Sequence, residues 1–293
     1  MTPQLNSENS TVAIFQQHYL ILQRHRRRVT LLSLTVFLIC FFAATIVGQF
    51  EPARIAAGFP RVFEYIEKIL PELSISSFNK DMAFWFYDFP KWMALLFETV
   101  LMAYIATLLG TLGAVSFCFF AANNLSQNRL VYFVTRRFLE IARTIPDLVY
   151  ALIFVFAFGL GPLAGILAIA IHSMGASGKL FAEASENIDM KPVDGLKGVG
   201  ANWFQTMRYA VIPQVLPNFV SYTLWRLEVN VRTAAVMGFV GAGGIGQELI
   251  TAIRMLYYED VSALVLLILA SVMCIDFICE KVRHSFIGKE NLA

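Results

Sequence analysis

The sequence predicts an all-α integral membrane protein with about six transmembrane helices. Hydrophobic residues make up 57% of the 293 residues and charged residues only 15%, which is too little polar surface for a soluble globule of this length. The hydrophobic residues also gather into several separate runs, each close to the roughly 20 residues that a helix needs to cross a bilayer. Long apolar runs divided by short polar segments therefore predict the fold class.

Residues 1–90 are predicted to hold an N-terminal tail, the first transmembrane helix and an external amphipathic segment. A short helix on the membrane surface is expected from Val12, anchored by the basic cluster at 24–28, with a disordered basic tail as the alternative. The first span follows at 29–48. In 51–90, apolar residues recur at helical spacing among charged ones, which predicts an amphipathic helix outside the bilayer.

Residues 91–293 are predicted to form the core of the protein. Five further spans are expected at 92–122, 138–159, 163–180, 218–240 and 261–279, with a second short external helix at 247–260. The span at 138–159 contains Pro146 and Asp147, which lipid would disfavour. We therefore expect that span to pack inside a bundle.

The distribution of basic residues predicts the orientation of these spans. Segments assigned to the inside carry fourteen of them: Arg24, Arg26, Arg27, Arg28, Arg129, Arg136, Arg137, Lys179, Lys191, Lys197, Arg208, Lys281, Arg283 and Lys289. Segments assigned to the outside carry six: Arg54, Arg61, Lys68, Lys80, Lys91 and Arg254. Cytoplasmic loops of membrane proteins are enriched in Lys and Arg. The bias predicts that both termini and the polar segment 183–217 are cytoplasmic.

The segment 183–217 lies between two spans, and no apolar stretch within it is long enough to cross a membrane. We expect a short helix, a glycine-rich turn and a stiff return, with Pro213 and Pro217 breaking the chain before it re-enters the bilayer. The small residues that allow a close approach of helices are Gly195, Gly198, Gly200 and Ala201. An ordinary cytoplasmic loop is the alternative interpretation.

Polar residues alternate within the fifth span, at Arg226, Glu228, Asn230 and Arg232. A charge near the bilayer centre costs at least about 2.5 kcal/mol on insertion scales, so these side chains must face protein or water. Glu228 and Arg232 stand at i and i+4, which suits a structural ion pair. The alternative is a pathway in which arginine offsets the charge of an anion. His172 is a weaker pathway candidate, because a hydrogen bond between helices explains it as well.

The glycines of GAGGIG, namely Gly241, Gly243, Gly244 and Gly246, satisfy the dinucleotide pattern G-x-G-x-x-G. That fingerprint needs a strand before it, and here a membrane span precedes it. We interpret these glycines as a gate, at which backbones approach closely or bend. An intramembrane enzyme would rest on this motif alone.

The sequence contains no G-x-x-x-x-G-K-[ST] motif, since GASGKL at 175–180 lacks the required glycine and hydroxyl. No metal-ligand cluster and no nucleophile–base set occurs either. We therefore expect no catalytic residue, no metal site, no cofactor bound by this chain and no nucleic-acid partner. Any ATP would be used by a partner subunit.

Several separated motifs resemble the permease subunits of ABC importers. DGLKGVGA at 194–201 and VIPQVLP at 211–217 resemble the EAA loop, with Asp194, Gly195, Gly200 and Ile212-Pro213 at its acidic, first alanine, glycine and Leu-Pro positions. The sequence departs from that pattern at Leu196 and Ala210. RTAAVMGFVGAGGIGQ at 232–247 resembles the span-and-gate segment of small type I importer permeases. Over about 129–287 the chain resembles the phosphonate type, the PhnE family, in GLGPLAGILAIAIHS at 159–173, GKLFAEASENID at 178–189 and YTLWRLEVNVRTAAVMGFVGAGGIG at 222–246.

This resemblance implies a type I ABC importer permease fold with a cytoplasmic coupling helix inside 183–217. The residues that it implies for coupling to the ATPase are Asp194, Gly195, Gly200, Ala201 and Pro213. The implied partners are a second permease copy or homologue, cytoplasmic ATP-binding subunits and an external substrate-binding protein, in the inner membrane of a bacterium. The implied substrate is a phosphonate or a related oxyanion such as phosphite. An importer of another small solute, such as an amino acid or an osmolyte, and a gradient-driven secondary transporter are the alternatives.

Overall fold

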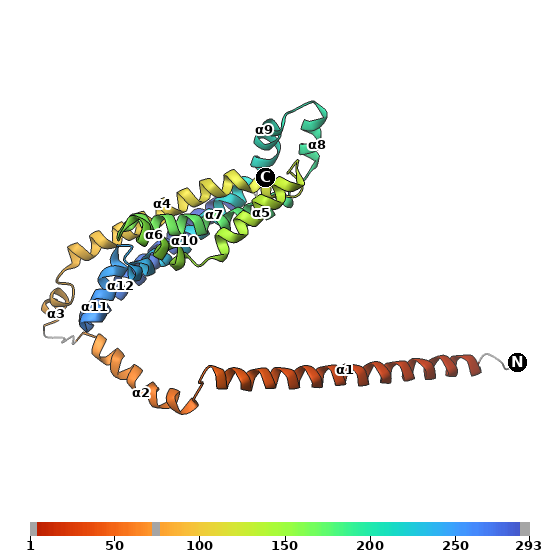
Figure 1. Cartoon of the computed structure of the whole chain (residues 1–293), viewed down its shortest axis with the longest axis horizontal. Helices are drawn as coiled ribbons and strands as arrows, with labels where there is room; N and C mark the ends of the chain where they lie inside the picture. Colours follow the sequence, from red (N-terminus) through yellow and green to blue (C-terminus); the bar gives the residue numbers. More distant parts are fainter. Residues whose placement is uncertain (1–4, 72–76, 288–293) are drawn as a thin grey trace. The chain divides into compact units, whose positions relative to one another are not determined.

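The computed structural model describes residues 5–71 and 77–287, and most of these residues are helical (Figure 1). The described residues contain no strand. The chain divides into two units, Met1–Glu67 and Lys68–Ala293, which we describe separately. The division predicted at residue 90 stays a prediction, and Lys289, counted above among the basic residues, lies outside the described residues.

The first unit begins with α1, an unbroken helix of 43 residues from Leu5 to Val47. Both expectations for the tail, a separate surface helix and a disordered segment, are therefore wrong. The physical reason is that no Gly or Pro occurs between Leu5 and Val47, so no residue strongly opposes helix continuation. The part from His18 to Val47 is long and apolar enough to cross a membrane.

Two shorter helices follow where the amphipathic external segment was expected. They are α2 (Pro52–Ile69) and α3 (Phe78–Trp85). In α2 the apolar and charged side chains gather on opposite faces, and none of its residues is buried. The prediction of an amphipathic helix in this region is confirmed.

The second unit is a helical bundle built around the contact between α4 and α7. Its helices are α4 (Phe89–Ala121), α5 (Arg129–Thr144), α6 (Asp147–Phe158), α7 (Pro162–Glu186), α8 (Lys191–Gly198), α9 (Trp203–Thr206), α10 (Ile212–Met237), α11 (Ile245–Met255) and α12 (Tyr258–Ile287). Across the described residues, four helices are long and apolar enough to cross a membrane, or six spans result if each of two bent helix pairs counts as one. The prediction of about six spans agrees with this finding.

One predicted span is divided into two helices. The span expected at 138–159 corresponds to the bent pair of α5 and α6, which together are long and apolar enough to cross a membrane but meet at an angle of 86°. Pro146 has no N–H and disfavours helical geometry in the residue before it. Ile145 accordingly has a ψ of 125°, in the extended region, and the chain turns there.

The return from the polar segment is helical from Trp203 onward, so the expected break at Pro213 and Pro217 is also wrong. A π-helical turn, Met207–Val211, joins α9 to α10. Pro213 stands in the first turn of α10, where its missing N–H costs little, and Pro217 lies inside the same helix. The wider π turn carries the helix into α10 despite the two prolines.

Three buried clusters follow one another along the bundle. Figure 1 places α8 and α9 at one end of the bundle, which we call the α8 end, and α3 and α11 at the opposite end, which we call the α11 end. The cluster at the α8 end includes Phe181, Val193 and Val211. The cluster at the α11 end includes Trp92 and Ile245. The middle cluster of small residues lets α4, α7 and α10 approach closely, and the polar residues of α10 lie at this level.

Candidate functional site

A buried chain of hydrogen bonds joins three helices in the middle of the bundle. Arg226 Nε of α10 donates to Ser173 Oγ of α7 at 3.1 Å, and Ser173 donates to Asn230 Oδ1 at 3.1 Å. Asn230 Nδ2 donates to Thr107 Oγ1 of α4 at 2.8 Å. Arg226 is 8% exposed and Asn230 1% exposed. The predicted residues Arg226 and Asn230 are thus brought together by one helix face, since they stand at i and i+4.

The guanidinium of Arg226 is only partly used by this network. Its Nε donates to Ser173, and this is the one hydrogen bond that the Arg226 side chain makes among the described residues, so the two terminal nitrogens have no partner there. The charge of Asp147, at the start of α6, acts on Arg226 without forming a direct ion pair. A guanidinium held by one nitrogen presents its remaining donors in a planar fork, which matches the oxygens of an anion.

Glu228 and Arg232 do not pair with each other, so the predicted i,i+4 ion pair is wrong. Glu228 pairs with Arg283, and Arg232 Nη2 lies 2.8 Å from Asp276 Oδ2. Both partners belong to α12, so these two residues point away from the helix face of Arg226 and Asn230. The ion pairs form between helices because α10 and α12 run antiparallel there. This direction places Arg283 opposite Glu228 and Asp276 opposite Arg232. The two couples fasten α12 to α10.

His172 lies on α7 beside the break between α5 and α6. Its Nδ1 is 3.2 Å from the carbonyl oxygen of Ile145, which can only accept, so Nδ1 carries the proton in this bond. The bond occupies a carbonyl that Pro146 leaves outside the regular helix. The helix-to-helix hydrogen bond expected as the simpler role of His172 is therefore present.

The coupling residues predicted in 183–217 lie at the α8 end, mostly on its exposed surface. Asp194, Gly195 and Gly200 are exposed, Ala201 is half-buried and Pro213 is exposed. A Cβ added at Gly195, Gly198 or Gly200 would meet no atom within 4 Å, so none of the described helices packs against these glycines. Gly200 has a φ of +85°, in the left-handed region that favours glycine. The outer face of α8 is open, while its inner face is fixed by Val193, which is 0% exposed.

The predicted gate glycines form a tight joint between α10 and α11, which meet at 48°. Gly241, Gly243 and Gly244 have φ values of +82°, +82° and +72°, a conformation that side chains disfavour. The joint is tied to two other helices, because Gly161 N–H before α7 donates to Gly241 O at 3.0 Å and Ile245 N–H donates to Thr99 Oγ1 of α4 at 2.9 Å. Both expectations, a bend and a close backbone approach, are present here.

We expect Gly246→Ala to lower the free energy of unfolding by about 3 kcal/mol, because overpacking against backbone cannot relax. A Cβ on Gly246 would overlap the carbonyl oxygen of Ala235 and lie 3.0 Å from its carbonyl carbon. Thermal unfolding of the purified protein in detergent measures the effect. The matched control is Gly198→Ala in α8, where the added methyl meets open space and stability should change by no more than about 0.5 kcal/mol. Equal stability of the two variants would contradict this close approach.

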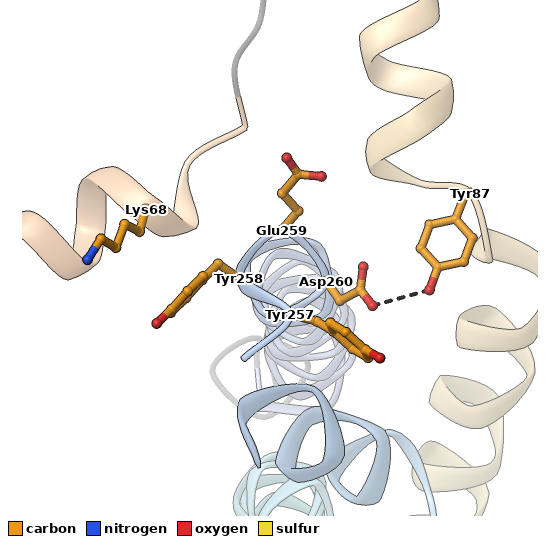
Figure 2. A pocket seen from close by; sticks show the side chains of 6 residues that line it. All are labelled: Lys68, Tyr87, Tyr257, Tyr258, Glu259 and Asp260. Atoms are coloured by element: carbon orange, nitrogen blue, oxygen red, sulfur yellow. Dashed lines mark hydrogen bonds between the residues drawn. The ribbon is translucent and has the colours of Figure 1, made fainter. Parts of the chain in front are cut away.

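Two hollows open at the α11 end. One, of about 420 Å³, is lined by Glu98, Gly243 and Gly244 and is bordered by Lys91, whose Nζ lies 2.6 Å from Glu248 Oε1. The other, of about 430 Å³, is drawn in Figure 2, where the Tyr87 hydroxyl points to Asp260 and donates to its Oδ2 at 3.2 Å. Burial raises the pKa of Tyr87, and the charge of Asp260 raises it further. In the described part of the chain, no group of three His, Cys, Asp or Glu side chains is placed to hold a metal ion.

Sequence reasoning missed the partners that organise these sites. Thr107 and Ser173 are small hydroxyl residues within apolar runs, and such residues commonly bond to a nearby backbone carbonyl, so their position alone gave little signal. Asp276 was a clearer signal, because an acidic residue inside the last apolar run requires a partner. Spacing within α10 pointed to a pair inside one helix, whereas the partners came from α12.

Comparison with known proteins gives one family match and several relatives. Residues 114–283 match the family model described as binding-protein-dependent transport system inner membrane component. The chain is 35% identical over 251 residues to the phosphite transport system permease protein PtxC of Stutzerimonas stutzeri, covering 86% of this chain and 87% of that one. It is 33% identical over 246 residues to the phosphate-import permease protein PhnE of Mycolicibacterium smegmatis, covering 82% of this chain and 44% of that one.

A solved structure with a similar fold is the MetNI methionine ABC transporter in inward-facing conformations. The TM-score is 0.59 at 20% sequence identity, and the match covers 65% of this chain and 94% of that chain. At that identity the likeness concerns the fold alone.

Proposed function

The chain belongs to the family of binding-protein-dependent transport system inner membrane components, and on that basis we propose that it is the permease subunit of an ATP-driven importer of a phosphonate or a related oxyanion such as phosphite. It is a multi-pass transport permease with the type I ABC importer fold. We propose three further properties: the substrate is a phosphorus oxyanion, the chain works with the partners named below, and the α8 end is cytoplasmic.

The observation that carries the proposal is the similarity to the phosphite permease PtxC over 86% of the chain. The names of two other relatives mention phosphate import and phosphonate transport. Phosphite, phosphate and phosphonates share a tetrahedral phosphorus atom with negatively charged oxygens. A site for any of them needs positively charged donors arranged for several oxygens.

Arg226 meets that requirement best among the predicted pathway residues. Its terminal nitrogens are free of hydrogen-bond partners in the described residues, and it sits at the middle level of the bundle with Asn230. We assign Arg226 and Asn230 to contact with the anion in transit. Glu228 and Arg232, predicted as pathway residues, hold α12 to α10 through their partners, and His172 fixes the turn between α5 and α6. One arginine whose charge is partly offset by Asp147 would bind an anion and still release it.

The coupling residues and the gate residues lie at opposite ends of the bundle, as an alternating-access pump requires. We propose that the α8 end is cytoplasmic and that Asp194, Gly195, Gly200, Ala201 and Pro213 contact an ATP-binding subunit. ATP-driven closure of two such subunits would draw two copies of α8 together, one from this chain and one from a second permease copy or homologue. The joint at Gly241, Gly243, Gly244 and Gly246 would then control access from the external side, where a substrate-binding protein delivers the ligand.

Reconstitution in liposomes tests this function. The chain is combined with its ATP-binding subunits and its external binding protein, and uptake of phosphite, methylphosphonate, phosphate and methionine is compared with and without ATP. We expect ATP-dependent uptake of phosphite or methylphosphonate that an ionophore does not abolish. Uptake that needs a gradient and no ATP would indicate a secondary transporter. Uptake of methionine in place of the anions would indicate an amino acid importer.

A further inference from the structure

We infer that Gln214 is a positioning residue that transmits the movement of α8 to α10, the helix that carries Arg226. This inference rests on the proposed function, because it concerns how the coupling segment drives the pathway. It is carried by the hydrogen bonds of one amide side chain at the base of that segment.

Gln214 joins the two ends of the segment around α8, because its side chain bonds to both the backbone N–H and the backbone carbonyl of Asp189. Its Oε1 accepts from Asp189 N–H at 3.0 Å, and its Nε2 donates to Asp189 O at 3.2 Å. The same Nε2 donates to Ala210 O at 2.7 Å, inside the π-helical turn. Only an amide supplies an acceptor and two donors together, and exchanging its oxygen and nitrogen would set like groups against each other at every contact.

The entry to the segment 183–217 is held by hydrogen bonds to α5 and to the residues after α4. Glu186, the last residue of α7, accepts from Arg136 Nη1 at 3.0 Å and from Asn123 N–H at 2.9 Å. Asn124 Nδ2 donates to Ser185 O at 3.0 Å. The end of α7 is therefore fastened to α5 and to the residues that follow α4.

Gln214 is the polar link between this held entry and the return helix. Among the described residues, it makes the only side-chain hydrogen bonds that join residues 187–198 to α10. Asp189 lies just before α8, and Gln214 lies in the first turn of α10. Besides the covalent connection through 199–211, a displacement of α8 reaches α10 through the Asp189–Gln214 bonds and through the apolar packing of Val193.

The transmitted motion has a continuous path to the proposed pathway. α10 runs without interruption from Ile212 to Met237, so Arg226 lies about three turns beyond Gln214 on the same rod. The rod ends at the glycine joint with α11. The turn before α10 is π-helical, and single π turns within α-helices are rare and occur frequently at functional sites. Without the bonds of Gln214, we expect the π turn to deform, so that α8 would move without moving α10.

The test compares three variants in the reconstituted complex: Gln214→Leu, Gln214→Glu and the control Gln205→Leu. Leucine keeps the approximate size of the side chain and removes all three bonds. Glutamate keeps the accepting oxygen and loses both donors. Gln205 is the matched control, because its Oε1 accepts from Asn202 N–H at 2.9 Å within the same segment and touches no other helix through that bond. The readout is the amount of anion moved per ATP hydrolysed, at equal amounts of assembled complex and with the unfolding temperature recorded.

We expect Gln214→Leu to lower the anion moved per ATP by about fivefold or more, the lower range of an allosteric coupling, while basal ATP hydrolysis persists. Gln214→Glu should give an intermediate ratio and Gln205→Leu a wild-type ratio. An unchanged ratio in Gln214→Leu, with a coupled wild type, would overturn this inference alone. If Gln214→Leu does not assemble, Gln214→Glu decides, and a wild-type ratio in it overturns the inference. A wild-type complex that moves no anion on ATP would refute the proposed function itself.

Discussion

Replacing Arg226 with glutamine is expected to lower ATP-dependent uptake of phosphite or methylphosphonate by about 10- to 100-fold. Hydrogen bonds to charged groups contribute about 1.5–3 kcal/mol, and every 1.4 kcal/mol corresponds to a factor of ten. Glutamine can still bond to Ser173 but lacks the positive charge and the two terminal donors that have no partner among the described residues. Radiolabelled uptake into liposomes that contain the complete complex, at several anion concentrations, measures the loss.

Arg232→Gln is the matched control for this experiment. Arg232 is also an arginine of α10, but its side chain is half exposed and already paired with Asp276. We expect its uptake to stay within about threefold of the wild type, the range of an exposed ion pair. Arg226→Lys should be intermediate, because a single ammonium keeps the charge and loses the planar fork. Unchanged uptake in Arg226→Gln would exclude Arg226 from the anion pathway.

Replacing Gly195 with tryptophan should abolish ATP-driven uptake, to less than about a tenth of wild type, and leave the membrane bundle folded. Gly195 lies on the open face of α8, where an added Cβ meets no atom of the described residues within 4 Å. Folding therefore tolerates the indole, whereas the proposed ATP-binding subunit would lose its approach to α8. Three measurements test this prediction. They are anion uptake, anion-stimulated ATP hydrolysis, and co-purification of the ATP-binding subunit with the chain.

The same substitution at Gly58 provides the control. Gly58 lies in α2, outside the segment 183–217, and a Cβ there also meets no atom of the described residues within 4 Å, so Gly58→Trp adds the same side chain at another open position. Gly200 is less suitable, because its φ of +85° would add backbone strain to any substitution. Full coupling in Gly195→Trp would contradict a role for the open face of α8 in binding the ATPase.

The fold class and most helices were predictable from the sequence, for one physical reason. A helix that crosses a bilayer needs a long apolar run. The number of such runs and their positions in the sequence therefore predict the number of spans and their approximate positions. α4, α7 and α12 appeared where the apolar runs predicted them. Within the second unit the departures arose at prolines, because Pro146 turned one expected span into a bent pair while Pro213 and Pro217 stayed within helical structure.

The sequence by itself also determined the candidate regions: the open polar segment around α8, the glycine joint and the charged stretch of α10. Each is visible as a local composition that an apolar span would not otherwise tolerate. Only the tertiary structure decided the partners. It placed Glu228 and Arg232 against α12, Arg226 against Ser173, and Gln214 against the backbone of Asp189. Such contacts depend on which faces of distant helices meet, and spacing along one helix carries no information about that.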